Sequence, residues 1–172
     1  MRLVIGTDLS EESLSAVRWG FNYAEMLRQR GQEARVKVLY VAKSRYPQAA
    51  DVSSESATPA KRKEAEKKVR NWIGEQLAVD GDYEVGVEGG VPREQLRGEV
   101  ETFDADWLVV GLTGRGAWSR LVAGSTALGL SHSPPTNMAV CHPDGSLFEQ
   151  TDELGVGVDF SEHSDHALEL AA

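Results

Sequence analysis

Glycine is concentrated in one short stretch of the chain, GLTGRGAWSRLVAGST at residues 111–126. Gly111, Gly114, Gly116 and Gly124 all lie within these sixteen residues. Glycine permits positive φ angles and a close approach of the backbone to a ligand, and successive N–H groups in such a turn form a concave anion site. Composition leaves two interpretations open: a cradle for a polyphosphate, or a flexible glycine-rich loop before an ordinary Ser/Thr-capped helix.

Hydroxyl and guanidinium groups accompany these glycines. Ser125 and Thr126 stand at the start of a predicted helix, where unpaired N–H groups and the helix dipole favour an anion and two hydroxyls can add hydrogen bonds. Arg115 and Arg120 bring positive charge into the same stretch. The physical chemistry therefore indicates phosphate as the ligand group.

Strand-like and helix-like patterns alternate along the rest of the chain and must position this stretch. Such alternation predicts an α/β fold, with a parallel sheet, right-handed crossovers and helices on both faces. The predicted strands are 3–7, 35–42, 83–87, 107–110 and 138–142, and the predicted helices are 10–30, 65–77, 92–103 and 125–131.

The first strand runs directly into polar residues. Asp8 follows the apolar run at residues 3–7, and Ser10 with Glu11 and Glu12 predicts an N-cap and an acidic first turn. A carboxylate just past a strand can accept hydrogen bonds from ribose hydroxyls or an adenine amino group. Asp8 can equally cap the helix, or do both.

The glycine spacing resembles the nucleotide-binding signature of the ATP-binding branch of the universal stress protein family, G-x2-G-x9-G-[ST]. The stretches IGTDLSEES, LYVA and ADWLVVG also fall where that family has them, so the resemblance covers roughly residues 1–143. Thr113 and the pair Asn137–Met138 depart from the usual family residues without touching the glycine frame. The second departure affects the edge through which such domains usually dimerise.

The resemblance implies a doubly wound, five-stranded parallel sheet of order 3-2-1-4-5, the adenine nucleotide α-hydrolase-like fold. In that order the first and fourth strands meet at the topological switch point, so Asp8 and Gly111 flank one crevice. The implied ligand is ATP, with or without Mg²⁺. Asp8 would lie at the adenosine end and Val41 would meet adenine through its backbone. The other implied site residues are Thr7, Gly111, Gly114, Arg115, Gly116, Gly124, Ser125 and Thr126.

Residues 3–21 and 154–172 align without a gap at a constant offset of 151, with Asp8 matching Asp159. This internal repeat predicts three parts: a universal stress protein domain at 1–143, a linker at 144–153 and an incomplete second repeat at 154–172. We expect the chain to be part of a tandem protein, with pairing of two domains, or of two chains in a homodimer, through the last strand.

Other chemistries fit the sequence less well. There is no G-x-x-x-x-G-K-[ST] motif, no trusted metal-ligand spacing among the four histidines and no residue that stands out as catalytic, so we expect at most a weak ATPase. The net charge of −9 and the pI near 4.9 argue against nonspecific binding to nucleic acid or anionic membranes. The single Cys141 and the lack of a signal peptide predict a cytoplasmic protein. The alternative function is a nucleotide-free dimerisation or interaction module of the same fold.

Overall fold

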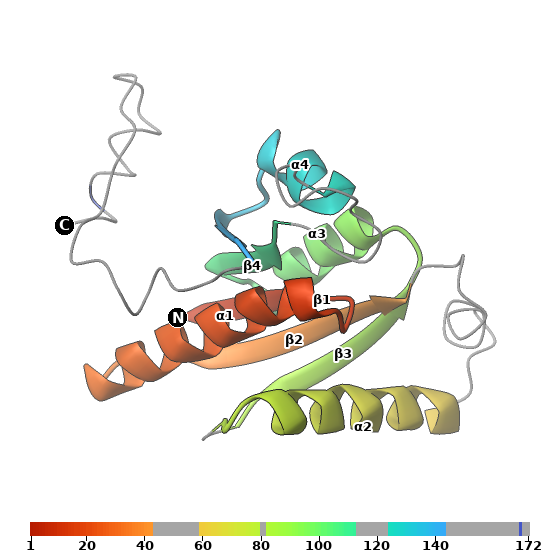
Figure 1. The fold of residues 1–172 in the computed structure, drawn as a ribbon. Helices are drawn as coiled ribbons and strands as arrows, with labels where there is room; N and C mark the ends of the chain where they lie inside the picture. The colour runs from red at the N-terminus through yellow and green to blue at the C-terminus, as the bar shows by residue number, and fades with distance from the viewer. Residues whose placement is uncertain (43–58, 80–81, 113–123, 144–168, 170–172) are drawn as a thin grey trace.

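The strands form one parallel sheet in the order β3-β2-β1-β4-β5, which confirms the predicted order and the doubly wound architecture (Figure 1). The computed structural model describes residues 1–42, 59–79, 82–112, 124–143 and 169. The elements are β1 (Arg2–Thr7), α1 (Glu11–Gln29), β2 (Arg35–Ala42), α2 (Pro59–Gln76), β3 (Glu84–Gly89), α3 (Pro92–Phe103), β4 (Trp107–Gly111), α4 (Ser125–Ser131) and β5 (Asn137–Cys141).

Strand β1 at the centre of the sheet and its neighbour β4 are deeply buried. Strands covered on both faces are apolar along their whole length rather than alternating, because each face packs on helices. Leu3, Val4 and Ile5 of β1 and Leu108 and Val109 of β4 are all 0% exposed. The centre of the sheet is therefore rigid up to the residues that follow these strands.

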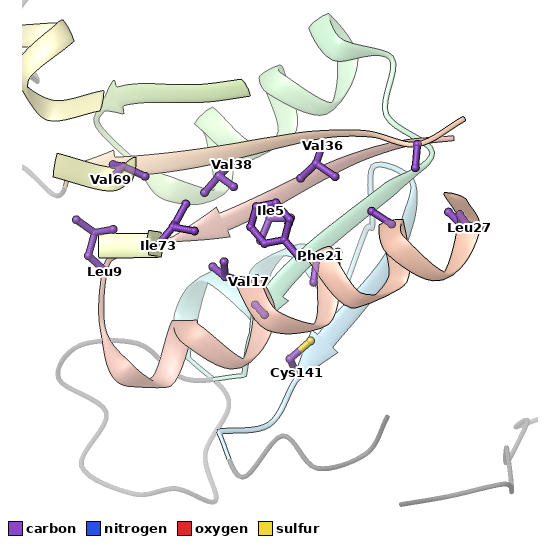
Figure 2. Packing of buried hydrophobic residues seen from close by; sticks show 14 of the residues in the cluster. Ile5, Leu9, Val17, Phe21, Leu27, Val36, Val38, Val69, Ile73 and Cys141 are labelled. Atoms are coloured by element: carbon purple, nitrogen blue, oxygen red, sulfur yellow. The ribbon is translucent and has the colours of Figure 1, made fainter. Parts of the chain in front are cut away.

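Two hydrophobic clusters cover the two faces of the sheet. On one face, α1 and α2 pack on the strands through residues that include Val17, Phe21, Val69 and Ile73 (Figure 2). On the other face, α3 and α4 supply Leu96, Val100, Phe103, Ala127 and Leu130. Right-handed crossovers on either side of the first strand place helices on both faces of the sheet.

Local chemistry sets the ends of α1 as predicted. Ser10 is the N-cap, and its hydroxyl oxygen accepts a hydrogen bond from the Ser13 N–H. Gly31 has a φ of +76° just past the C-cap Arg30, a conformation that glycine adopts without steric cost.

The structure moves several predicted boundaries. β3 ends at Gly89 instead of Val87, because its ladder with β2 continues to the pair Ala42–Gly89. β5 spans Asn137–Cys141, one residue earlier than predicted, because Asn137 pairs with Trp107. α2 begins at Pro59, six residues before the predicted start at Ala65, so its charged first part is helical although nothing there is buried.

Candidate functional site

The carboxyl ends of β1 and β4 lie side by side. Ile5 pairs with Val109, and both strands continue two residues past this pair, to Thr7 and Gly111. Asp8 follows Thr7 directly. The residues predicted to flank one crevice thus stand at one edge of the sheet, as a topological switch point requires.

Val41 lies near the same edge on the neighbouring strand. The ladder between β1 and β2 ends at the pair Thr7–Tyr40, so Val41 extends one residue past the end of β1. On its other side Val41 pairs with Glu88 of β3. Its side chain is 4% exposed and belongs to the apolar cluster beneath α3. Its side chain is therefore unsuited to a polar ligand, and the contact of adenine with the backbone of Val41 stays a prediction.

The loop between β1 and α1 is held by its own side chains. The Thr7 hydroxyl lies 2.9 Å from the Ser13 hydroxyl and accepts a hydrogen bond of 3.0 Å from the Leu9 N–H. Leu9 has a φ of +59°, which is uncommon for a residue other than glycine. Its buried side chain offsets this cost by packing in the core (Figure 2). Thr7 is 6% exposed, and its side chain supports the loop. The candidate ligand contacts of Thr7 are therefore its backbone atoms.

Asp8 takes part in the same network. Its Oδ1 accepts hydrogen bonds from the Ser10 N–H at 3.2 Å and from the Ser10 hydroxyl at 2.5 Å. The hydroxyl of Ser13 in turn accepts from the Ser10 N–H at 3.2 Å and donates to the Ser10 carbonyl at 3.0 Å. The carboxylate of Asp8 is therefore oriented by the cap of α1, and one of its oxygens is committed to that cap.

Sequence reasoning missed Ser13. This residue completes a reciprocal capping box with Ser10, a role usually taken by Glu or Gln three residues after the N-cap. The S-x-x-S spacing of Ser10 and Ser13 was the available signal. A buried serine at this position also ties the end of β1 to the first turn of α1 through Thr7.

Two backbone hydrogen bonds fix the described ends of the glycine-rich stretch. The Leu112 N–H donates to the Cys141 carbonyl at 2.7 Å, and the Gly124 N–H donates to the Leu112 carbonyl at 2.6 Å. Gly111 and Gly124 are therefore both held at the carboxyl end of β4. The predicted residues Gly114, Arg115 and Gly116, together with Arg120, lie outside the described residues.

The start of α4 differs from the ordinary Ser/Thr cap that was one of the two interpretations. Gly124 is the N-cap, and no side-chain hydrogen bond caps this helix in the part of the chain that the structure describes. Ser125 and Thr126 occupy the first turn, where Ser125 is exposed and Thr126 is half-buried. Their hydroxyls are thus not used in capping α4.

The remaining reactive groups in the described ranges do not form a second site. Burial raises the pKa of the Cys141 thiol to about 12, so this side chain is a core residue, as predicted, and not a nucleophile. The Nδ1 of His132 lies 2.8 Å from the Leu128 carbonyl, one turn earlier. Among the described residues, no three His, Cys, Asp or Glu side chains gather to hold a metal ion. No helix in the described ranges is long and apolar enough to cross a membrane.

Comparison with known proteins shows what the chain is similar to. A sequence model of the universal stress protein family matches residues 1–142. The structure of the universal stress protein UspA from Lactobacillus plantarum is 23% identical, with a TM-score of 0.59 over 81% of this chain and 96% of that chain. The hypothetical protein MJ0577 is 20% identical, with a TM-score of 0.61 over 81% and 93%. A universal stress protein from Archaeoglobus fulgidus is 21% identical, with a TM-score of 0.50 over 81% and 97%. No curated protein sequence matches significantly.

Proposed function

Because the chain belongs to the universal stress protein family, we propose that it binds ATP, or another adenine nucleotide, at the carboxyl edge of β1 and β4. The observation that carries the proposal is the hydrogen bond from the Gly124 N–H to the Leu112 carbonyl, because it brings both ends of the glycine-rich stretch beside the end of β1. Backbone N–H groups of glycines are suited to phosphate oxygens.

Each part of the proposed site has its own role. Asp8 and the backbone atoms of Thr7 and Val41 face the adenosine in this proposal. The residues proposed to surround ribose and phosphates are Gly111, Gly114, Arg115, Gly116, Gly124, Ser125 and Thr126. Any Mg²⁺ would be held mainly by the phosphates, which are the partners this ion commonly keeps.

The proposed role is regulation in the cytoplasm and not fast catalysis. Asp8, the acidic side chain that directly follows β1, uses one of its oxygens to accept two hydrogen bonds from Ser10 and so serves the cap of α1. We therefore expect slow or no ATP hydrolysis, with the bound nucleotide tuning assembly or partner contacts in a stress response.

Equilibrium titration of nucleotide-free protein with ATP and Mg²⁺ tests the proposal, with Gly124→Val as the matched variant. Gly124 has φ −62° and ψ 152°, which valine adopts without strain, so the variant should fold and lose binding through steric overlap with the phosphates. A thermal melt checks the fold. The proposal fails if wild type shows no binding at millimolar ATP, or if Gly124→Val binds as well as wild type.

Two substitutions at Asp8 separate capping from ligand binding. Asp8→Asn keeps an Oδ1 acceptor for the N–H and the hydroxyl of Ser10, but it removes the charge and replaces the second oxygen with an NH₂ donor. Asp8→Ala removes the charge and both oxygens. If Asp8 holds the adenosine, both variants lose affinity by about 10- to 100-fold, because a hydrogen bond to a charged group contributes about 1.5–3 kcal/mol. If Asp8 only supports the cap, Asp8→Ala lowers the unfolding free energy by about 1 kcal/mol and neither variant changes affinity.

A second candidate function is a nucleotide-free interaction module that pairs through β5. This strand is at the edge of the sheet, and Val140 on it is 41% exposed. Exposed edge strands are ready templates for pairing with another chain. Mass spectrometry of gently purified protein distinguishes the candidates, because copurified adenine nucleotide favours the first. Val140→Lys should dissociate a dimer formed through β5 without changing ATP affinity, as measured by sedimentation and titration.

A further inference from the structure

Acidic residues are distributed unevenly along the chain. Eight of the 27 Asp and Glu residues follow Pro143, whereas none of the 18 Lys and Arg residues does. Residues 1–143 therefore carry a formal net charge of −1, and residues 144–172 carry −8. The charge argument against anionic partners thus concerns the C-terminal segment and not the domain that matches the family.

Helix α2 has the opposite charge. It contains six basic and three acidic residues among its 18. The basic residues are Lys61, Arg62, Lys63, Lys67, Lys68 and Arg70. Its first turn contains no acidic residue, although the positive end of a helix dipole favours negative charge. The excess of cations at this end therefore does not serve the stability of the isolated helix.

Only three of these six cations have an interaction partner within the part of the chain that the structure describes. The Arg62 guanidinium lies 3.9 Å from the Glu88 carboxylate, and the Arg70 guanidinium stacks over the Tyr83 ring at 4.9 Å from its centroid. Lys61 also has an interaction partner. The other three basic residues, Lys63, Lys67 and Lys68, are exposed, and no ion pair joins them to another part of the described chain.

These three lysines share the outward side of α2. The buried residues of the helix are Val69 and Ile73, through which it packs beside β3 at the edge of the sheet (Figure 1). At 100° per residue, Lys63, Lys67 and Lys68 all point at least about 100° away from the middle of that buried side. We refer to Lys63, Lys67 and Lys68 as the α2 lysine face.

We propose that the acidic segment 144–172 of the same chain docks on the α2 lysine face. The segment has the complementary charge and no cation of its own. It can reach, because 29 extended residues span up to about 95 Å, whereas four strand spacings between β5 and β3 amount to about 19 Å. Covalent attachment raises the local concentration of the segment to the order of millimolar, so several weak exposed ion pairs act together.

Paramagnetic relaxation in the 172-residue chain tests this docking. A nitroxide is attached at Ser164→Cys in a Cys141→Ala background, and line broadening of backbone amides is compared between α2 and the exposed side of α1. Docking predicts stronger broadening at residues 61–70 in low salt. Broadening should be lost in 1 M NaCl, where the Debye length falls to about 3 Å.

Charge reversal identifies the surface. The triple variant Lys63→Glu, Lys67→Glu, Lys68→Glu should abolish broadening in α2. The matched control Arg18→Glu, Arg30→Glu, Arg93→Glu makes the same charge change at three exposed positions on or next to α1 and α3 and should leave the broadening intact. Circular dichroism checks that both variants fold.

Several outcomes would overturn the proposal. The proposal fails if α1 and α2 are broadened equally, or if broadening of α2 survives the lysine reversal. It also fails if broadening is seen only when spin-labelled and isotope-labelled chains are mixed, because the contact would then lie between molecules. If broadening is absent but a 20-nucleotide RNA binds wild type and not the lysine variant, the α2 lysine face is a nucleic-acid surface instead.

Discussion

The close contact between α1 and β1 depends on Gly20, and replacing this residue tests the packing quantitatively. A Cβ at position 20 would lie 2.4 Å from Cδ1 and 2.8 Å from Cγ1 of Ile5. Ile5 is 0% exposed and lies in the central strand, so its side chain cannot move aside without displacing other core groups (Figure 2). Overpacking of this kind typically costs about 1–3 kcal/mol.

A second effect opposes this cost. Alanine is a better helix former than glycine by about 1 kcal/mol, so the substitution also favours α1. Gly74 in α2 is the matched control, because a Cβ there would have no neighbour within 4 Å. We expect Gly74→Ala to stabilise by about 1 kcal/mol. Gly20→Ala should range from neutral to destabilising by about 2 kcal/mol, and the difference between the two variants isolates the overpacking cost of about 1–3 kcal/mol.

Urea denaturation at 25 °C, followed by circular dichroism, gives the unfolding free energies of both variants. Ile5→Val then removes the Cδ1 atom. Alone it should cost about 0.5–1.5 kcal/mol, but combined with Gly20→Ala it removes the closer of the two contacts, at 2.4 Å, so the two changes should couple by at least about 0.5 kcal/mol. The packing argument is refuted if Gly20→Ala stabilises as much as Gly74→Ala, or if its effect simply adds to that of Ile5→Val.

Two further predictions concern the cap of α1 and the buried thiol. Ser10→Ala removes the cap oxygen that accepts from the Ser13 N–H and should lower the unfolding free energy by about 1 kcal/mol, whereas Ser131→Ala at an exposed helix end should change it by less than about 0.5 kcal/mol; equal effects in urea denaturation would contradict the capping role. Because burial raises the pKa of Cys141 from 9.0 to about 12, its stabilising contribution is complete below pH 9 and is lost between pH 9 and about 12. Compared with Cys141→Ala, wild type should therefore lose up to about 1.4 kcal/mol more per pH unit in that window, and parallel pH profiles would show that the thiol does not titrate on unfolding.

The parallel α/β architecture was predictable because it follows from local patterns, and the family resemblance implied the order of the strands. Apolar runs alternating with capped helices define a parallel sheet, and in the order 3-2-1-4-5 the residues after its first and fourth strands meet. Asp8 and Gly111 could be placed in this way without any knowledge of side-chain contacts. Gly31 was equally accessible, since its left-handed φ is a local requirement at the end of α1.

Features that depend on contacts between distant segments could not be predicted. β3 extends to Gly89 only because β2 offers it a partner as far as Ala42. The capping choice at α4 depends on the Leu112 carbonyl, which holds Gly124 at the N-cap position and leaves Ser125 in the first turn. The hydroxyl of Ser13 meets that of Thr7 only once β1 and α1 are folded against each other.

In β1 and β4, the boundary between the buried framework of the sheet and the candidate site lies where the fully buried side chains end. From Leu3 to Ile5 and from Leu108 to Val109 the side chains are fully buried, so their substitution changes stability first. Beyond them, Asp8 and Gly124 engage polar loop and backbone groups, and their substitution can change ligand affinity while the sheet stays intact. Thr7 lies on this boundary because its buried hydroxyl links the strand to the helix cap that orients Asp8. Its loss should therefore affect stability and affinity together, which neither a purely structural nor a purely ligand-binding residue would do.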